Sequence, residues 1–209
     1  MRLTKFEHSC LLVEADAGRV LIDPGAFSHG FEDLTGLTAV LVTHQHPDHI
    51  DLDRIGQLVH NNPQAAWYAD EATAALLAEQ GVQASVVHDG DRLDVGTEIT
   101  VHGVNHAVIH PDIPVVPNVG YLLGGRFFHP GDAFTVPAEP VDVLGLPTAA
   151  PWQKIAEAVD YLRAVAPRRA VPIHEAVLAR PEVYYKHFER LALSGTTVTV
   201  VPSGDTVEI

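Results

Sequence analysis

Short apolar and β-branched runs, separated by polar turn residues, fill the first part of the chain and predict β-strands. The predicted strands cover residues 2–7, 9–14, 19–23 and 39–43. The run at 39–43 is continuously apolar, which is typical of a strand that is buried on both faces of a sheet. Helical spacing follows, first in the apolar residues between Leu52 and Val59 and then in the alanine-rich segment 71–80. This part of the chain therefore predicts a sheet followed by two helices.

The same order of elements recurs after Gly81. Strand-like runs come first, at 84–87, 98–104, 119–123, 127–128 and 141–146. An amphipathic helix is predicted from Pro151, with an apolar face formed by Ile155, Ala158, Val159, Leu162 and Val165. A strand at 170–173, a helix at 181–193 and two short strands complete the chain. We therefore predict one α/β domain over residues 1–209, made of two similar halves that meet near 105–125, with stacked sheets inside and helices on the outer faces.

Composition limits the class of protein. The chain has 209 residues, of which 46% are hydrophobic, so it can form a sizeable core. No apolar run approaches the roughly 18–20 residues that a membrane span needs, and the start of the chain shows no signal-peptide core. We therefore expect a cytoplasmic protein with no membrane partner. Cys10 is the only cysteine and lies in an apolar run, so we expect a buried thiol and no thiolate metal cluster.

Charge argues against a nucleic-acid partner. Acidic residues outnumber Lys and Arg by 27 to 13, which gives a net charge of −14, and such a surface repels phosphate backbones. We therefore expect a small-molecule substrate, while homo-oligomerisation is left open. The chain also has 13 histidines, and their placement carries the functional argument.

The most informative segment is Thr43-His44-Gln45-His46-Pro47-Asp48-His49, which follows the predicted buried strand. Three histidines and an aspartate lie within it, at the point where a strand ends and a helix begins. A strand alternates its faces and a helix brings residues i and i+4 together, so neither element alone gathers all four side chains. A loop at the end of a strand can fold them around two metal centres on a rigid scaffold. A solvated helix cap would be the simpler interpretation of one histidine, but not of His-x-His-x-Asp-His after a buried strand.

With this motif the chain resembles the metallo-β-lactamase superfamily. The resemblance implies an αβ/βα four-layer sandwich of two stacked mixed sheets with outer helices. Asp23, in Ile22-Asp23-Pro24-Gly25, is similar to a first-motif aspartate that supports the histidine loop without binding metal. By the same resemblance, His44 and His46 would bind a first metal ion, and Asp48 and His49 would bind a second.

Later motifs of the superfamily can be found in order. Asp132, in Gly131-Asp132, resembles the bridging aspartate, and His174, which ends Pro172-Ile173-His174, resembles the last histidine ligand of the second metal. A further histidine ligand is expected earlier in the chain than the bridging aspartate. His106 follows the end of a predicted strand, where a ligand should lie, and is the preferred candidate. His110, farther into the loop, and His102, within the strand, remain alternatives.

The start of the chain narrows the resemblance. Phe6-Glu7-His8-Ser9-Cys10 is similar to the small UPF0173-like and UlaG-like branch, in which a histidine of the first hairpin often approaches the metal site. His8 is therefore a candidate pocket residue, with a hydrogen-bonded core role as the alternative. The branch usually has glycine where this chain has Glu7. His129, which precedes Gly131-Asp132, is a candidate for a supporting hydrogen bond.

The expected ligands suggest the metal and the reaction. Imidazole and carboxylate ligands without thiolates suit Zn²⁺, Mn²⁺ or iron, and we expect two Zn²⁺ ions because hydrolysis needs a Lewis acid and no redox cycle. Two such ions, roughly 3.5–4 Å apart, can share a water and lower its pKa towards about 7. Asp132 would bridge the pair and Asp48 would receive a proton, so both are candidate catalytic residues. We expect a hydrolase that uses this activated hydroxide on a small ester, lactone or phosphodiester. A redox-active diiron oxidoreductase and a non-catalytic metal-binding module are the alternatives.

Loops should set the choice of substrate. Residues 109–118 contain three prolines and predict a stiff, partly apolar rim, on which His110 lies, and Trp152 is a candidate apolar wall or simply a helix-start packing residue. Basic residues are absent from three segments that should face the metals: 20–53, 103–125 and 127–153. Only Arg180 is well placed in the sequence to reach the pocket. Because sites for polyanions use several Lys or Arg contacts, we expect a neutral or singly charged substrate.

Overall fold

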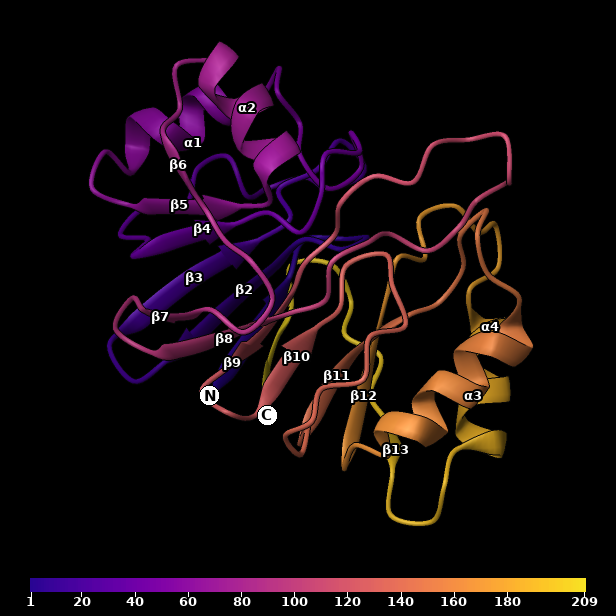
Figure 1. The fold of residues 1–209 in the computed structure, drawn as a ribbon. Helices are drawn as coiled ribbons and strands as arrows, with labels where there is room; N and C mark the ends of the chain where they lie inside the picture. Colours follow the sequence, from indigo (N-terminus) through magenta and orange to yellow (C-terminus); the bar gives the residue numbers. More distant parts are fainter.

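The computed structural model describes all of residues 1–209 and contains two stacked seven-stranded mixed sheets with a pair of helices on each outer side (Figure 1). The first sheet has the strand order β14-β1-β2-β3-β4-β5-β6, and the second has the order β13-β12-β11-β10-β9-β8-β7. The strands of the first sheet are β1 (Arg2–Lys5), β2 (Leu11–Ala15), β3 (Gly18–Ile22), β4 (Ala39–Leu41), β5 (Ala66–Ala69), β6 (Ala84–Val86) and β14 (Thr206–Glu208). Those of the second are β7 (Arg92–Asp94), β8 (Glu98–His102), β9 (Gly120–Leu123), β10 (Phe127–His129), β11 (Val143–Pro147), β12 (Arg169–Ile173) and β13 (Thr197–Val198). The helices are α1 (Ile55–Asn61), α2 (Glu71–Glu79), α3 (Ile155–Val165) and α4 (Glu182–Leu191).

Three apolar clusters hold the four layers together. The largest lies between the sheets and combines residues such as Leu41 of β4 with Tyr121 of β9 and Phe127 of β10. A second cluster packs the outer face of the first sheet against α1 and α2, and a third packs the second sheet against α3 and α4. Both sheets are thus covered on both faces, which explains why β4 is a continuous apolar run. The predicted four-layer α/β sandwich is confirmed.

Strand direction brings the functional loops to one edge. In the first sheet β3 and β4 are parallel, and β1 runs the same way because two antiparallel pairings separate it from β3. In the second sheet β10, β11 and β12 are parallel, and β8 runs the same way for the same reason. The loops that follow these strands therefore leave each sheet at a common edge, where polar side chains from distant parts of the sequence can meet.

The sequence-based prediction differs from the structure in three places. Strands β5 and β7 were not predicted, because each is only three or four residues long and lies next to helix or turn residues. Helix α3 begins at Ile155 and not at Pro151, because the chain first forms a turn that carries Trp152 towards the loops. The chain passes from the first sheet to the second between β6 and β7, earlier than the range 105–125, and β14 then returns to the first sheet.

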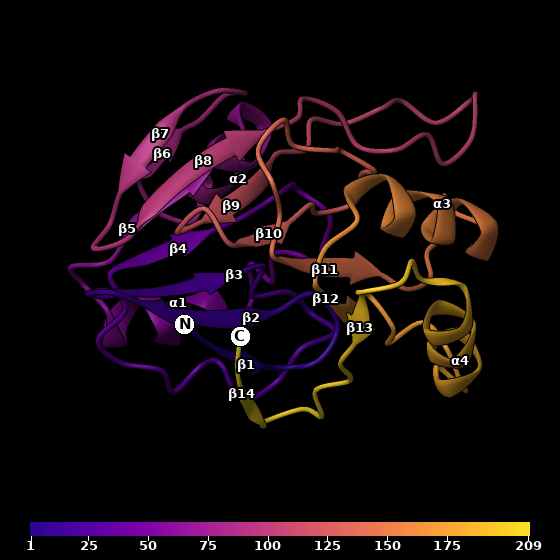
Figure 2. The same ribbon diagram turned by 90° about the horizontal axis from the view of Figure 1, so that it is seen from below.

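Two further features bear on the site. The long loop between β8 and β9 projects beyond the sheets on the side of the molecule where α3 lies (Figures 1 and 2). The two ends of the chain lie side by side, because β14 pairs with β1. None of the four helices is long and apolar enough to cross a membrane.

Candidate metal centre

Eight polar side chains converge where the loop edges of the two sheets meet. They form three overlapping groups, in each of which the potential ligand atoms lie within 4.8 Å of one another. The groups are His8-Asp48-His49-His174, His44-His46-His106 and His44-His49-Asp132. The cluster contains all seven predicted ligands together with His8. It is buried except at His46 and Asp48, which are half-buried and form its open side.

Asp23 holds the histidine loop from behind. Its carboxylate accepts hydrogen bonds from the Thr43 backbone N–H (2.8 Å), the Thr43 hydroxyl (2.8 Å) and His49 Nδ1 (2.7 Å). Asp23 is fully buried and is absent from the groups that could hold a metal. Gly25 lets the following turn pass close to the loop, since a Cβ there would lie 1.8 Å from the Asp48 carbonyl oxygen. The carboxylate therefore orients the loop without joining the cluster.

Three histidines of the cluster have one ring nitrogen committed as a donor. Their Nδ1–H groups donate to oxygen atoms that can only accept: His49 to Asp23 Oδ2 (2.7 Å), His106 to the Ala107 carbonyl (2.5 Å) and His174 to the Ala149 carbonyl (2.7 Å). A neutral imidazole that donates from Nδ1 carries a lone pair on Nε2. Fixing the tautomer by such an outer hydrogen bond is how proteins present histidine to a metal.

The inward-facing atoms of the cluster are acceptors that face other acceptors. His49 Nε2 lies 3.1 Å from Asp132 Oδ1, and the Nε2 atoms of His174 and His106 lie 3.2 and 3.4 Å from Asp132 Oδ2. The three Nε2 atoms and Asp132 Oδ1 are buried and have no hydrogen-bond partner. Buried lone pairs at such distances are costly unless cations lie between them. These residues therefore fit a bound metal, and in its absence protons must take the place of the metal charge.

The group His44-His46-His106 faces the open side of the cluster. His44 Nε2 and His46 Nδ1 are 3.0 Å apart, and the rings of both lie within 4.9 Å of the His106 ring, centroid to centroid. His44 Nδ1 lies 3.1 Å from the Thr43 hydroxyl oxygen. Because that hydroxyl donates its hydrogen to Asp23, it can accept the Nδ1–H of His44 and leave Nε2 directed inward.

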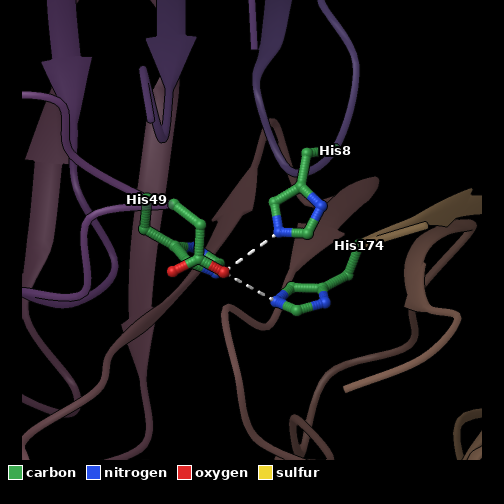
Figure 3. Close-up of side chains that lie close together, drawn as sticks. His8, His49 and His174 are labelled. Atoms are coloured by element: carbon green, nitrogen blue, oxygen red, sulfur yellow. Dashed lines mark hydrogen bonds and ion pairs between the residues drawn. The ribbon is translucent and has the colours of Figure 1, made fainter. Parts of the chain in front are cut away.

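His8 differs from the other histidines. The Ala176 backbone N–H donates to His8 Nδ1 (3.3 Å), so the hydrogen of the neutral ring lies on Nε2, which donates to Asp48 Oδ2 (3.1 Å). Figure 3 shows His8 and His174 directed at the same carboxylate oxygen, which lies 3.4 Å from His174 Nε2. His8 is buried at the turn after β1. As the hydrogen-bond donor, it orients the Asp48 carboxylate.

The pKa values of the cluster residues are set by burial and by nearby charges, which act in opposite directions. Burial alone would raise the pKa of Asp132, but His49 and His174 hold that pKa well below its usual range. Burial would lower the pKa of His174, but Asp132 and Asp48 outweigh it and raise the pKa to about 9. The pKa of His49 is likewise raised, by Asp132 and Asp23, against the effect of burial. Burial lowers the pKa of His8 to about 4, despite its hydrogen bond to Asp48, so that ring stays neutral.

Several supporting contacts could not be read from sequence motifs. Trp152, which we expected as a pocket wall or a packing residue, is buried, and its indole N–H donates to Asp132 Oδ2 (2.7 Å). Asn118 Oδ1 accepts the backbone N–H of Asp132 (2.9 Å). Lys5 is buried close to the segment that carries His174, where it pairs with Glu175 and donates to the Pro172 carbonyl (2.7 Å). No residue type or spacing distinguishes these positions in the sequence.

Some predicted residues lie outside the ligand cluster, and the predicted pocket roles of His110 and Arg180 stay predictions. His110 is exposed on the projecting loop, where its Nδ1 accepts the backbone N–H of Asp112. His102 packs edge-on against Phe128. Arg180 is exposed, and its side chain forms no hydrogen bond or ion pair. His129 does support the site: it accepts the Gly131 N–H at Nδ1 (3.2 Å), and its Nε2 lies 2.9 Å from the Ser9 carbonyl oxygen.

Several known proteins are similar to the chain in sequence or in structure. The protein Rv0786c of Mycobacterium tuberculosis is 56% identical over 204 residues, which covers 94% of each chain. A UPF0173 metal-dependent hydrolase of Aeropyrum pernix is 25% identical and covers 99% of this chain and 97% of its own. Among solved structures, the metallo hydrolase Igni18 of Ignicoccus hospitalis has a TM-score of 0.73 at 24% identity, covering 99% of this chain and 97% of its own. The diiron β-hydroxylase CmlA of Streptomyces venezuelae has a TM-score of 0.70 at 15% identity, covering 100% of this chain and 54% of its own.

The two structural likenesses lie below 25% identity and show the fold alone. The family assignment rests on a family model, described as a beta-lactamase superfamily domain, that matches residues 2–174. That range contains every residue of the cluster. The chain therefore belongs to the metallo-β-lactamase superfamily, as the histidine loop predicted.

Proposed function

We propose that the protein is a hydrolase that holds two divalent metal ions and acts on a small neutral or singly charged ester, lactone or phosphodiester. The proposed ligands are His44, His46, Asp48, His49, His106, Asp132 and His174. Zn²⁺ is the proposed metal, because nitrogen and oxygen donors without thiolate suit it and hydrolysis needs no redox change. Two relatives with similar sequences, from Aeropyrum pernix and Alkaliphilus metalliredigens, carry the name UPF0173 metal-dependent hydrolase.

One observation carries the proposal. The Nε2 atoms of His49, His106 and His174 are turned inward by their outer hydrogen bonds, and all three meet the carboxylate of Asp132 at 3.1–3.4 Å without a hydrogen-bond partner. A structural polar network would satisfy these buried atoms with donors. With neutral rings the arrangement has acceptors only, which is what a pair of cations requires; without metal, the raised pKa values of His49 and His174 keep protons in their place.

Different side chains would have different roles in the reaction. When bound, the metal ions would supply Lewis acidity and lower the pKa of a water molecule towards about 7. Asp132 lies beside His49, His106 and His174 and would be a ligand that both metal ions share. Asp48 lies at the open side, where its carboxylate can receive a proton from the attacking water. His8 holds one oxygen of Asp48 and so limits the orientations that this carboxylate can take.

The surroundings of the open side favour a substrate with little charge. Val108 and Val177 are exposed apolar residues on two of the loops that carry the cluster, and Phe27 is exposed on the loop after β3, where its ring lies 5.2 Å from the His8 ring, centroid to centroid. Lys5 is the only buried lysine or arginine, and it is already paired with Glu175. Such a rim offers apolar contacts and one arginine, Arg180 on the loop of Val177, rather than the several basic contacts that a polyanion needs.

A substrate panel tests the proposal. Metal-stripped and Zn²⁺-loaded protein would be assayed with matched esters, lactones, phosphodiesters and β-lactams, and with single-stranded RNA, across a salt series. We expect turnover of a small substrate by the loaded protein alone, with little salt dependence. Salt-sensitive nuclease activity without small-molecule turnover would contradict the proposed substrate class. Bound iron with oxygen consumption and no hydrolysis would contradict the proposed reaction.

A further inference from the structure

The segment after β11 contacts two of the proposed ligands at once. The Ala149 carbonyl accepts the Nδ1–H of His174 (2.7 Å), and three residues later the Trp152 indole N–H donates to Asp132 Oδ2 (2.7 Å). The segment is itself fixed to the neighbouring strand, because the Thr148 N–H donates to the Ile173 carbonyl (2.8 Å). Residues 148–152 thus form a brace behind the metal centre.

The Trp152 ring has little freedom within this brace. Its ring is packed edge-on by Phe134, with centroids 4.9 Å apart, and by His106 at 6.0 Å. Phe134 in turn packs against Tyr161 of α3 at 5.0 Å. Edge-to-face contacts of this kind fix ring orientation as well as position. The direction of the indole N–H is therefore set by the packing of α3 on the second sheet.

The hydrogen bond sets the orientation of the Asp132 carboxylate. The backbone of Asp132 is held by Asn118, and Trp152 adds a contact to Oδ2. The other oxygen, Oδ1, is left without a hydrogen-bond partner and lies 3.1 Å from His49 Nε2. Asp132 is 3% exposed, so water cannot replace the indole as a donor without rearrangement.

We propose that Trp152 is a positioning residue that holds the Asp132 carboxylate in the orientation in which both metal ions can share it. The inference rests on the proposed metal centre and assigns a role to a residue that acts through a metal ligand and is not a ligand itself. Loss of an outer partner of a metal ligand typically weakens metal binding by roughly 10–100-fold, and we expect Trp152 to fall in this range.

The substitution Trp152→Phe removes the N–H and keeps a ring in the aromatic cluster. Trp67→Phe is the matched control, because Trp67 is the only other tryptophan and is buried in the cluster between the first sheet and the helices α1 and α2. Zn²⁺ affinity would be measured by competition with a chromophoric chelator, and thermal unfolding of the metal-free proteins would be followed in parallel. We expect Trp152→Phe to weaken Zn²⁺ binding by about 10–100-fold and Trp67→Phe to leave it unchanged. Unchanged Zn²⁺ affinity in Trp152→Phe, whatever its melting temperature, would overturn the proposal.

A double-mutant cycle shows whether Trp152 acts through Asp132. In an Asp132→Ala background, Trp152→Phe should weaken Zn²⁺ binding no further, because the group that it positions is gone. An equal loss in both backgrounds would overturn the proposal. If wild-type protein bound no Zn²⁺, the proposed function would already have failed, and the two failures are thereby distinguished.

Fluorescence gives a readout that does not depend on a Trp152 substitution. In Trp67→Phe, Trp152 is the sole tryptophan, and its emission should change as Zn²⁺ is added, with the same midpoint as metal binding. The change should vanish when Asp132→Ala is added. Emission that does not respond while Zn²⁺ binds would overturn the proposed contact.

Discussion

His49 donates its Nδ1 hydrogen to Asp23 Oδ2 at 2.7 Å, and both side chains are fully buried. This bond joins the residue that follows β3 to the loop that follows β4, and these two strands are parallel neighbours in the first sheet. It also fixes the tautomer of the neutral His49 ring, so that the lone pair on Nε2 faces the cluster once the proton there is displaced. The first motif and the histidine loop therefore act as one unit.

Asp23→Ala should damage the fold as well as the site. It removes the acceptor of three buried hydrogen bonds, and breaking a buried charged network in this way typically costs about 3–5 kcal/mol. We expect a lower free energy of unfolding for the metal-free protein, measured in denaturant, together with weaker metal binding. Asp112→Ala, at an exposed aspartate of the projecting loop, is the control. Unchanged stability of Asp23→Ala would show that the carboxylate does not hold the loop.

Asp132→Ala should act on the metals themselves. A carboxylate shared by both ions contributes to each, so its removal should abolish turnover and loosen both metals. Elemental analysis after dialysis and a hydrolysis assay check this. Normal metal content with normal activity would refute the assignment of Asp132 as the bridging ligand.

Three histidine variants rank the candidates for the further histidine ligand that precedes Asp132 in the chain. His106 lies in the cluster, whereas His110 is exposed on the projecting loop and His102 packs against Phe128. His106→Ala should therefore weaken metal binding by more than the roughly 10–100-fold that loss of an outer partner costs. His102→Ala and His110→Ala should leave metal affinity near the wild-type value in the same chelator competition. A larger loss in His110→Ala than in His106→Ala would contradict the geometry.

Metal binding should release protons at neutral pH. The pKa of His174 is raised to about 9 in the metal-free protein and that of His49 is also raised, so both rings carry protons that a metal must displace. Calorimetric titration near pH 7.5, in buffers of different ionisation enthalpy, should show net proton release and an affinity that falls as the pH is lowered. Binding without proton release would mean that the histidines are already neutral.

The same shift predicts how stability depends on pH. A pKa raised from 6.5 to about 9 stabilises the folded metal-free protein fully below pH 6.5, and this contribution is lost as the pH rises through 9. The melting temperature of metal-free protein should therefore fall between pH 6.5 and 9. The metal-loaded protein, in which His174 is neutral in any case, should show no such fall. Parallel melting curves of both forms test the difference.

The main features of the fold could be predicted from hydrophobic periodicity. Strands such as β4 are continuous apolar runs because they are covered on both faces, and that signal is strong in the sequence. The edge strand β7 and the short strand β5 were not predicted, because each has few residues and the neighbouring sequence is typical of turns or helix. The start of α3 was misplaced because Pro151 is favourable at a helix start, whereas here it belongs to the turn that carries Trp152.

In the candidate site, too, some residues could be predicted from the sequence and others could not. Its proposed ligands follow strand ends in short motifs, so their residue types and their order along the chain point to them. The supports of those ligands could not be found in this way. The Ala149 carbonyl is a backbone atom, and the indole of Trp152 reaches Asp132 only because of how α3 packs. Lys5 meets Glu175 across 170 positions of the chain, and no local pattern records such a contact.

Two metal ions should occupy the cluster formed by the loop edges of the two sheets. The most direct measurement is the metal content of the full chain, purified natively, saturated with Zn²⁺, freed of loose metal by gel filtration and analysed by mass spectrometry of the elements against protein concentration. We predict two ions per chain in the wild-type protein. A reproducible value of one or less at saturation would contradict the two-metal account.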